Sequence, residues 1–116
     1  MSDDRTDRVF AALAHASRRR ILDLLTESPG MSVKALASHF DVSRIMVLKH
    51  LRALEDAGLV LSKRAGRERR LFFNPVPLQE VYDRWTDRYS AFWAARMTDI
   101  KSRVEARASG KESKRA

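Results

Sequence analysis

The fold is decided by residues 31–74, which read MSVKALASHFDVSRIMVLKHLRALEDAGLVLSKRAGRERRLFFN. Ser32 and Ser43 can each accept a backbone N–H as the N-cap of a helix, and Gly58 can adopt the left-handed conformation that closes one. These signals predict a short helix after Ser32, a turn at residues 40–42, and a longer helix that ends just before Gly58. Because so short a connection makes two helices cross steeply, the pattern predicts a helix-turn-helix.

The longer helix divides its residue types between two faces. Val47, Leu51 and Leu54 recur at steps of four and three, so they form one buried stripe. The outward surface mixes cations with apolar residues, and such a surface suits DNA binding. Arg or Lys reads guanine, and an aliphatic group packs against a thymine methyl. An ordinary amphipathic helix with a few stray apolar residues explains the pattern equally well. The outward residues are Arg44, Ile45, Leu48, Lys49 and Arg52.

A basic hairpin is predicted next. Residues 59–61 begin a strand, Ala65 and Gly66 provide the turn, and Leu71 and Phe73 alternate on the return strand. A solvated turn does not need five cations opposed by a single glutamate, so we interpret the hairpin as a wing that lies along the phosphate backbone. The cations are Lys63, Arg64, Arg67, Arg69 and Arg70.

Three runs of sequence together resemble the ArsR family of bacterial winged helix-turn-helix transcriptional regulators. They are LAHASRRRILDLL at residues 13–25, VKALASHFDVSRIMVLKHLRALEDAGLV at residues 33–60, and GRERRLFFN at residues 66–74. The likeness covers roughly residues 9–74, with the motifs in the family's order. It implies a homodimeric repressor that binds a two-fold-related operator and places one recognition helix per subunit in the major groove.

The chain departs from the family in its sensing chemistry. The resemblance places a cysteine-containing metal motif at residues 32–36, but the sequence has no cysteine. Its three histidines, His15, His39 and His50, have no i, i+4 spacing and no recognisable carboxylate pattern. We therefore predict a branch of the family without metal and without cofactor, and the sequence names no inducer. In the recognition helix, Ile45, Met46 and Leu48 stand where the commonest family pattern has small hydroxyl residues.

Charge is concentrated in the segment that contains the recognition helix and the wing. The net charge is +8, and residues 43–76 carry eight cations and three anions, whereas residues 1–42 and 77–106 are each neutral. The remaining +3 lies in residues 107–116. This partition favours a polyanionic partner for the central segment. We predict a winged helix-turn-helix DNA-binding and dimerisation domain at residues 1–106 and a basic flexible tail at residues 107–116.

Two further helices are expected before the decisive stretch, over residues 3–14 and from a Ser17 cap to about Glu27. The core positions of the second are Ile21, Leu22, Leu24 and Leu25. Cations are unfavourable at a helix start, and the second helix begins with the triplet at residues 18–20. Two explanations remain open: contact with DNA phosphate, or salt bridges to acidic neighbours such as Asp23. We favour a salt bridge for at least one of the three.

A last helix is predicted from Leu78 to about Arg107. Such a helix of about 30 residues is roughly 45 Å long, which exceeds what its own domain can cover. We expect Leu78 and Tyr82 to pack on the domain core and the distal aromatic and aliphatic residues to pair with a second copy. A cofactor pocket lined by the aromatics is a less favoured alternative. The predicted dimer interface contains Val9, Phe10, Trp85, Tyr89, Phe92, Trp93, Met97, Ile100 and Val104.

The predicted fold class is mainly α with a β wing, a winged helix-turn-helix with a long C-terminal dimerisation helix. We predict a sequence-specific DNA-binding repressor that acts as a homodimer on an inverted repeat of double-stranded DNA. An architectural protein that binds DNA through charge alone and a protein-interaction module are the alternatives. No phosphate loop, paired carboxylates or activated nucleophile is recognisable, so an enzyme is not expected. An acidic N-terminus and the absence of an apolar run of about 20 residues predict a cytoplasmic protein without a membrane span.

Within this prediction the DNA-binding residues have distinct tasks. Arg44, Ile45 and Lys49 reach base edges, while Ser43 and Arg52 assist at the backbone. The wing holds phosphates with Lys63, Arg64, Arg67 and Arg69.

Overall fold

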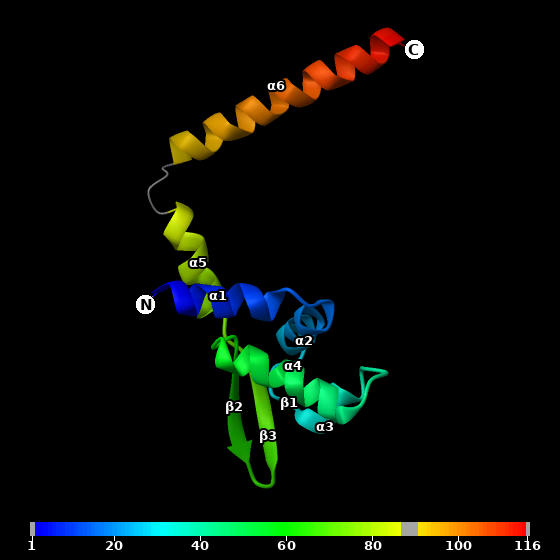
Figure 1. The fold of residues 1–116 in the computed structure, drawn as a ribbon, viewed down its shortest axis with the longest axis vertical. Helices are drawn as coiled ribbons and strands as arrows, with labels where there is room; N and C mark the ends of the chain where they lie inside the picture. The colour runs from blue at the N-terminus through cyan, green and yellow to red at the C-terminus, as the bar shows by residue number, and fades with distance from the viewer. Residues whose placement is uncertain (1, 87–90, 116) are drawn as a thin grey trace. The chain divides into compact units, whose positions relative to one another are not determined.

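The computed structural model describes the backbone of residues 2–86 and 91–115, and side chains of residues 4–86 and 94–108. The chain divides into two units, Met1–Val81 and Tyr82–Ala116, which are described separately. The elements appear in Figure 1 and follow in chain order. They are α1 (Ser2–Leu13), α2 (Ala16–Glu27), β1 (Met31–Ser32), α3 (Val33–Ala37), α4 (Arg44–Asp56), β2 (Val60–Ala65), β3 (Glu68–Phe73), α5 (Val76–Thr86) and α6 (Ala91–Arg115).

The caps that define the helix-turn-helix are confirmed. The Ser32 hydroxyl accepts the backbone N–H of Ala35 at 3.1 Å, and the Ser43 hydroxyl accepts that of Met46 at 3.2 Å. Each bond satisfies a donor that the first turn of a helix leaves without an intrahelical acceptor. Gly58 follows α4 with φ of +75°, the left-handed conformation that its missing Cβ permits.

Two predicted boundaries were wrong. Ser17 does not cap α2, which begins at Ala16 with His15 as its N-cap and without a side-chain cap bond. The connection between α3 and α4 spans residues 38–43 rather than 40–42, because α3 ends at Ala37. Its first part stays tightly wound, since the backbone N–H of His39 bonds to the carbonyl of Leu36 at 3.1 Å.

One apolar core joins the helices to the sheet. Val47, Leu51 and Leu54 of α4 are each at most 1% exposed, which confirms the predicted stripe. Leu24 is only partly buried, and the rest of the predicted α2 core is buried. Leu78 packs against the core as expected, but Tyr82 is 63% exposed, so that prediction was wrong. The buried side chains are Val9, Ala12, Ile21, Leu22, Leu25, Val33, Leu36, Val47, Leu51, Leu54, Leu59, Val60 and Leu71.

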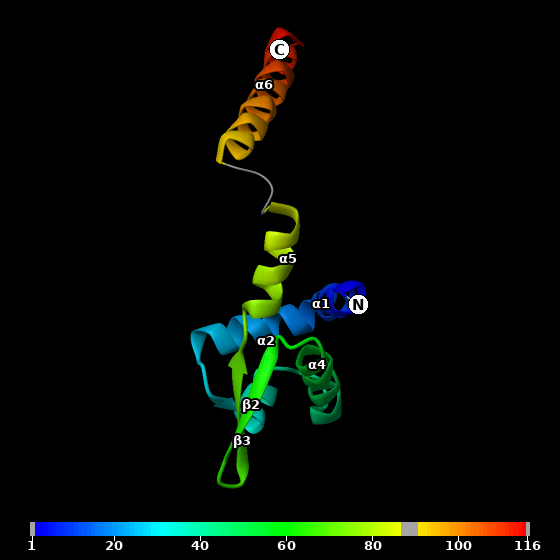
Figure 2. The same cartoon turned by 90° about the vertical axis from the view of Figure 1, so that its left-hand side faces the viewer.

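The wing is the larger part of a three-stranded antiparallel sheet with the order β1-β3-β2. β2 and β3 form the hairpin that extends away from the helices in Figures 1 and 2. Residues 66 and 67 connect them, so the predicted turn at Ala65 and Gly66 was wrong by one residue, because Ala65 still pairs with Glu68 at the end of β2. Gly66 has φ of +65°, as the first central position of a type II′ turn requires. The short strand β1, which the sequence did not predict, pairs Met31 with Leu71.

Asn74 fastens the base of the wing to the end of α4. Its side-chain amide donates to the carbonyl of Gly58 at 2.9 Å, and its side-chain oxygen accepts the N–H of Val76 at 3.2 Å. Its backbone N–H bonds to Leu59 at 2.8 Å. The bonds to Gly58 and Leu59 fix where the wing ends relative to the longer helix, and the bond from Val76 holds the start of α5.

The range of the predicted last helix contains two described helices, α5 and α6. Residues 87–90, which lie between them, are outside the described part of the chain, so the continuity of the predicted helix stays a prediction. α6 continues to Arg115, past the end expected near Arg107, and therefore contains most of the segment assigned to a flexible tail. The domain boundary at residue 106 remains a prediction. Among the described residues, no helix is both long and apolar enough to cross a bilayer.

Candidate nucleic-acid interface

The outward face of α4 lies directly opposite its buried stripe. The outward residues Ile45, Lys49 and Arg52 follow one another at steps of four and three. Each precedes a residue of the buried stripe by two positions, which places it about 200° around the helix axis from that residue. All three are exposed, and Ile45 is 69% exposed. The face therefore combines one large aliphatic side chain with two cations in a single line along the helix.

The flanks of this face are also accessible. Arg44 is the first residue of α4 and is exposed, as is Ser43 before it. Met46 and Leu48 are 40% and 39% exposed. Since the Ser43 hydroxyl already caps α4, its predicted backbone contact with DNA requires the same oxygen or the main chain at the helix start.

The pairing of the two wing strands separates their cations by face. Arg64 pairs with Arg69 and lies on the same face as the buried Leu71, whereas Lys63 pairs with Arg70 on the opposite face. Arg67 lies in the turn itself. Within the described chain, Lys63, Arg64 and Arg67 are exposed and no ion pair involves them.

Arg69 differs from the other three cations predicted to hold phosphates, because it is paired with a carboxylate of another element. Its guanidinium is paired with the Glu55 carboxylate of α4, with an Nη2 to Oε1 distance of 2.5 Å. Arg70 is engaged as well, with Glu68 at 3.1 Å and with the carbonyl of Gly30 at 3.3 Å. The sequence indicated Glu68 as the single carboxylate that balances the wing cations. The structure adds a second carboxylate, Glu55, which comes from α4.

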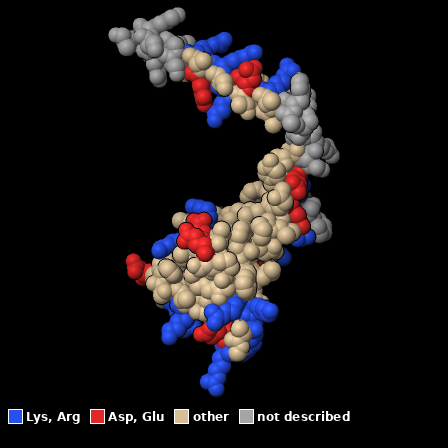
Figure 3. Space-filling model, turned by 180° about the vertical axis from the view of Figure 1, so that it is seen from behind, with Lys and Arg blue, Asp and Glu red and all other residues tan. Residues whose placement is uncertain are grey.

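Lys and Arg side chains gather around the wing on the face drawn in Figure 3. This concentration agrees with the net charge of +5 for residues 43–76. A local excess of positive charge raises the concentration of a polyanion near the surface and supplies binding that does not depend on sequence.

The arginine triplet of α2 has a role that neither predicted explanation anticipated. Arg18 Nη1 donates to the carbonyl of Ala11 at 3.1 Å, and Arg19 Nη1 donates to the carbonyl of Leu13. Both acceptors are in the last turn of α1, where carbonyls lack intrahelical partners and the helix dipole favours cations. Arg20 lies over the ring of Phe40 at 4.9 Å. Among the described residues, no ion pair joins the triplet to Asp23.

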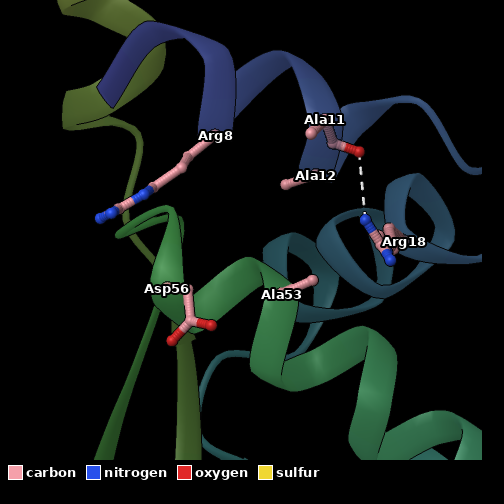
Figure 4. A pocket seen from close by; sticks show the side chains of 6 residues that line it. All are labelled: Arg8, Ala11, Ala12, Arg18, Ala53 and Asp56. Atoms are coloured by element: carbon pink, nitrogen blue, oxygen red, sulfur yellow. Dashed lines mark hydrogen bonds between the residues drawn. The ribbon is translucent and has the colours of Figure 1, made fainter. Parts of the chain in front are cut away.

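Arg18 also borders an open hollow of about 450 Å³ between α1, α2 and α4. Figure 4 shows Arg18 on one side and Arg8 and Asp56 on the other, with small side chains between them. The small residues are Ala11, Ala12 and Ala53. These alanines leave space that longer side chains would fill, and the hollow is bordered by charges of both signs.

His50 connects α4 to this arginine. Its Nδ1 accepts the Nε–H of Arg18 at 3.2 Å, and its ring centroid lies 5.9 Å from that of His15. Burial, the Arg18 charge and His15 together lower the pKa of His50 below its ordinary value of 6.5. The imidazole therefore acts as a neutral acceptor that joins α4 to α2.

Acidification is expected to destabilise the fold through His50. Because the pKa of His50 is lower in the folded chain than in the unfolded chain, the unfolded state binds the proton more readily. The free energy of unfolding should therefore fall as the pH drops through about 6.5, and urea unfolding between pH 7.5 and 5 measures it. His50→Gln should reduce this dependence, whereas His39→Gln, at an exposed site, should retain it. Equal pH profiles for the two variants would contradict the assignment.

The predicted dimer residues occupy different environments. Val9 is 3% exposed and belongs to the core of its own domain, which corrects its assignment to the interface. Phe10 and Trp85 are 50% and 53% exposed. Met97, Ile100 and Val104 of α6 are 61%, 46% and 64% exposed and share one helix face. Tyr89 lies outside the described residues, and Phe92 and Trp93 belong to α6 but their side chains are not described.

Sequence reasoning missed three residues that shape the site: Glu55, Arg18 and Asn74. For Glu55, the available signal was its partner Arg69. Arg69 alternates with Leu71 and Phe73 and so belongs to the strand face that meets α4. For Arg18, the unfavourable placement of cations at a helix start indicated that another element supplies the compensation. In the described part of the chain, no cluster of three or more His, Cys, Asp or Glu residues is arranged to hold a metal ion.

Comparison with known proteins places the chain among transcriptional regulators. Residues 13–62 match a family described as a helix-turn-helix domain. The HTH-type transcriptional regulator YuzN of Bacillus subtilis (strain 168) is 41% identical over 87 residues, which cover 70% of this chain and 95% of YuzN. The transcriptional repressor SdpR of the same organism is 33% identical over 72 residues, 62% of this chain and 79% of SdpR.

Solved structures give the same result. An ArsR-like transcriptional regulator from Rhodococcus sp. RHA1 is 36% identical, with a TM-score of 0.66 over 87% of this chain and 93% of that one. The homodimeric winged helix-turn-helix DNA-binding domain of Mb0332 from Mycobacterium bovis, described as a possible ArsR-family regulator, is 27% identical. Its TM-score is 0.59 over 74% of this chain and 82% of Mb0332. These proteins are regulators, not enzymes, in agreement with the sequence prediction.

Proposed function

This chain belongs to the ArsR-like winged helix-turn-helix transcriptional regulators, which are DNA-binding proteins, and from that membership we propose that it represses transcription as a homodimer on an inverted-repeat operator. The observation that carries the proposal is the outward line of Ile45, Lys49 and Arg52 on α4, beside a wing with exposed cations. Each subunit would place α4 in the major groove and its wing along the phosphate backbone. The protein would work in the cytoplasm, where the DNA is.

The residues of the helix have separate tasks in this proposal. Arg44 and Lys49 donate to guanine acceptors, while Ile45 packs against thymine methyl groups. Ser43 and Arg52 contact the backbone on either side of the groove. Lys63, Arg64 and Arg67 hold phosphates at the wing.

A repressor that must read two half-sites needs two copies of the recognition helix. The exposed stripe of Met97, Ile100 and Val104 supports pairing, because a soluble protein rarely leaves a row of large apolar side chains in water. Mb0332, which shares the fold, is described as homodimeric, and SdpR is described as a repressor. No metal or cofactor is part of the proposal.

Selection of bound duplexes from a random pool tests the function directly. We expect an enriched inverted repeat that binds at least about 10³-fold more tightly than random DNA, as specific regulators do. An architectural protein that binds through charge alone would show a steep salt dependence without enrichment. That result would overturn the proposed regulator of a defined operator.

Arg67→Ala is expected to weaken binding to every sequence by a similar factor. Arg67 lies in the exposed wing turn, so it would contact phosphate and not base edges. Each lost phosphate contact should reduce the slope of log K against log salt concentration by about 0.9. Titrations from 50 to 200 mM salt on selected and random duplexes measure both effects. Lys101→Ala removes one cation from an exposed position in α6 and should leave the slope unchanged.

A further inference from the structure

We propose that Glu55 is a positioning residue that withdraws Arg69 from DNA, so that each wing holds phosphates with Lys63, Arg64 and Arg67 only. This inference rests on the proposed function and assigns a task to a carboxylate that lies between the recognition helix and the wing. It predicts that Arg69, one of the four cations assigned to phosphate from the sequence, makes no phosphate contact.

Lower exposure distinguishes this pair from the other ion pairs among the described residues. Arg69 Nη2 and Glu55 Oε1 are 2.5 Å apart, and the two side chains are only 41% and 30% exposed. The other described ion pairs have partners that are each 46% exposed or more. Reduced exposure limits competition by water and screening by salt, so this pair should persist at ionic strengths that disrupt the others.

The strand register explains why a carboxylate is needed at this place. Arg69 is directly opposite Arg64, and like charges in a cross-strand pair repel each other. Glu55 projects from α4 toward the same strand face and neutralises one of the two cations. Arg64 is then the cation of that face left without an ion pair among the described residues.

The pair also joins the two elements that the proposal requires to act together. α4 carries the base-reading side chains and β3 belongs to the wing, and Glu55 and Arg69 are 14 positions apart in the chain. Phosphate contacts fix the register of a protein on the duplex. A wing tied to α4 therefore holds the recognition helix in one position relative to the backbone.

Release of Arg69 is measured by the salt dependence of binding to random DNA. In Glu55→Gln the neutral amide no longer holds the guanidinium, so Arg69 becomes a fourth wing cation and the slope should steepen by about 0.9 per bound wing. Affinity for random duplex at 50 mM salt should rise several-fold. The double variant Glu55→Gln with Arg69→Gln should return to the wild-type slope, because the neutral pair offers no additional cation.

Asp56→Asn is the matched control, since it removes the same charge from the next residue, which is exposed and borders the hollow between α1, α2 and α4. We expect it to keep the wild-type slope. Equal steepening by Glu55→Gln and Asp56→Asn would overturn the proposal, because net charge alone would then account for the change. A double variant about 0.9 flatter than wild type would also overturn it, since Arg69 would already be in contact with phosphate.

The Arg67→Ala variant separates this inference from the proposed function. If Arg67→Ala flattens the slope and Glu55→Gln has no effect, the wing binds DNA and only the assignment of Glu55 is wrong. If wild-type protein fails to bind duplex DNA, the proposed function falls and the inference with it. Thermal unfolding of each variant at the titration pH verifies that the compared proteins are folded.

Discussion

Replacing Ile100 by Lys is expected to convert the protein from a dimer to a monomer and to weaken its binding to an inverted repeat by about 10²- to 10⁴-fold. In a dimer, once one recognition helix has bound its half-site, the other binds the second half-site intramolecularly. This raises the affinity for the full operator by a factor of that size. Ile100 is the central residue of the exposed stripe with Met97 and Val104, and a buried ammonium without a partner would oppose pairing. Sedimentation equilibrium at micromolar concentration measures the mass, and titration of a full operator measures the affinity.

Ser102→Lys is the control for this experiment. Ser102 is exposed on the opposite side of α6, so the variant adds the same charge without entering the stripe. It should remain dimeric and bind the operator as the wild type does. A monomeric wild-type protein, or a dimer that survives Ile100→Lys, would contradict the proposed interface and would favour a protein-interaction module whose α6 binds a different partner.

Interactions between near neighbours in the chain were predictable from the sequence. Ser32, Ser43 and Gly58 each act on backbone groups within about one helical turn, so the residue type and its position are sufficient. The buried stripe of α4 follows in the same way from the helical period. These local signals determine most of the helix-turn-helix, and Gly66 located the hairpin turn to within one residue.

Interactions across the fold were not predictable in this way. Arg18 bonds to His50 across 32 positions, and Arg70 bonds to Gly30 across 40 positions. Neither spacing corresponds to the period of a helix or a strand, so no pattern in the sequence identifies the partners. The missed strand β1 has the same origin, because its two residues become a strand only by pairing with β3.

Neighbouring apolar residues caused the error at Val9. Val9 and Phe10 were both assigned to the dimer surface, although adjacent helical residues point about 100° apart. Val9 faces the core at 3% exposure, and Phe10 is 50% exposed. For Arg69, counting cations hid the alternation of the strand, which directs one residue in two toward α4. In both cases the side that a residue faces was more informative than its type.

Lys49→Ala is expected to reduce binding to the selected operator by about 1 to 3 kcal/mol, or roughly 5- to 160-fold, while binding to random DNA falls much less. Lys49 is exposed at the centre of the outward line of α4, directly opposite the buried stripe. A donor at this position would contact a guanine acceptor, and its removal would leave that acceptor without its bond. The variant should also accept other base pairs at the position that Lys49 reads. Arg44→Ala should have the same kind of effect at a different position.

The discriminating measurement compares Lys49→Ala with Lys63→Ala on two duplexes, the selected operator and a scrambled sequence of equal length. Both substitutions remove one lysine charge, but Lys63 lies on the wing and would contact phosphate. Lys49→Ala should therefore lower the ratio of the two affinities, whereas Lys63→Ala should weaken both duplexes by one factor and keep the ratio. If the two variants change the ratio equally, the division between a base-reading helix and a phosphate-holding wing is wrong, because charge at either site would then serve the same purpose.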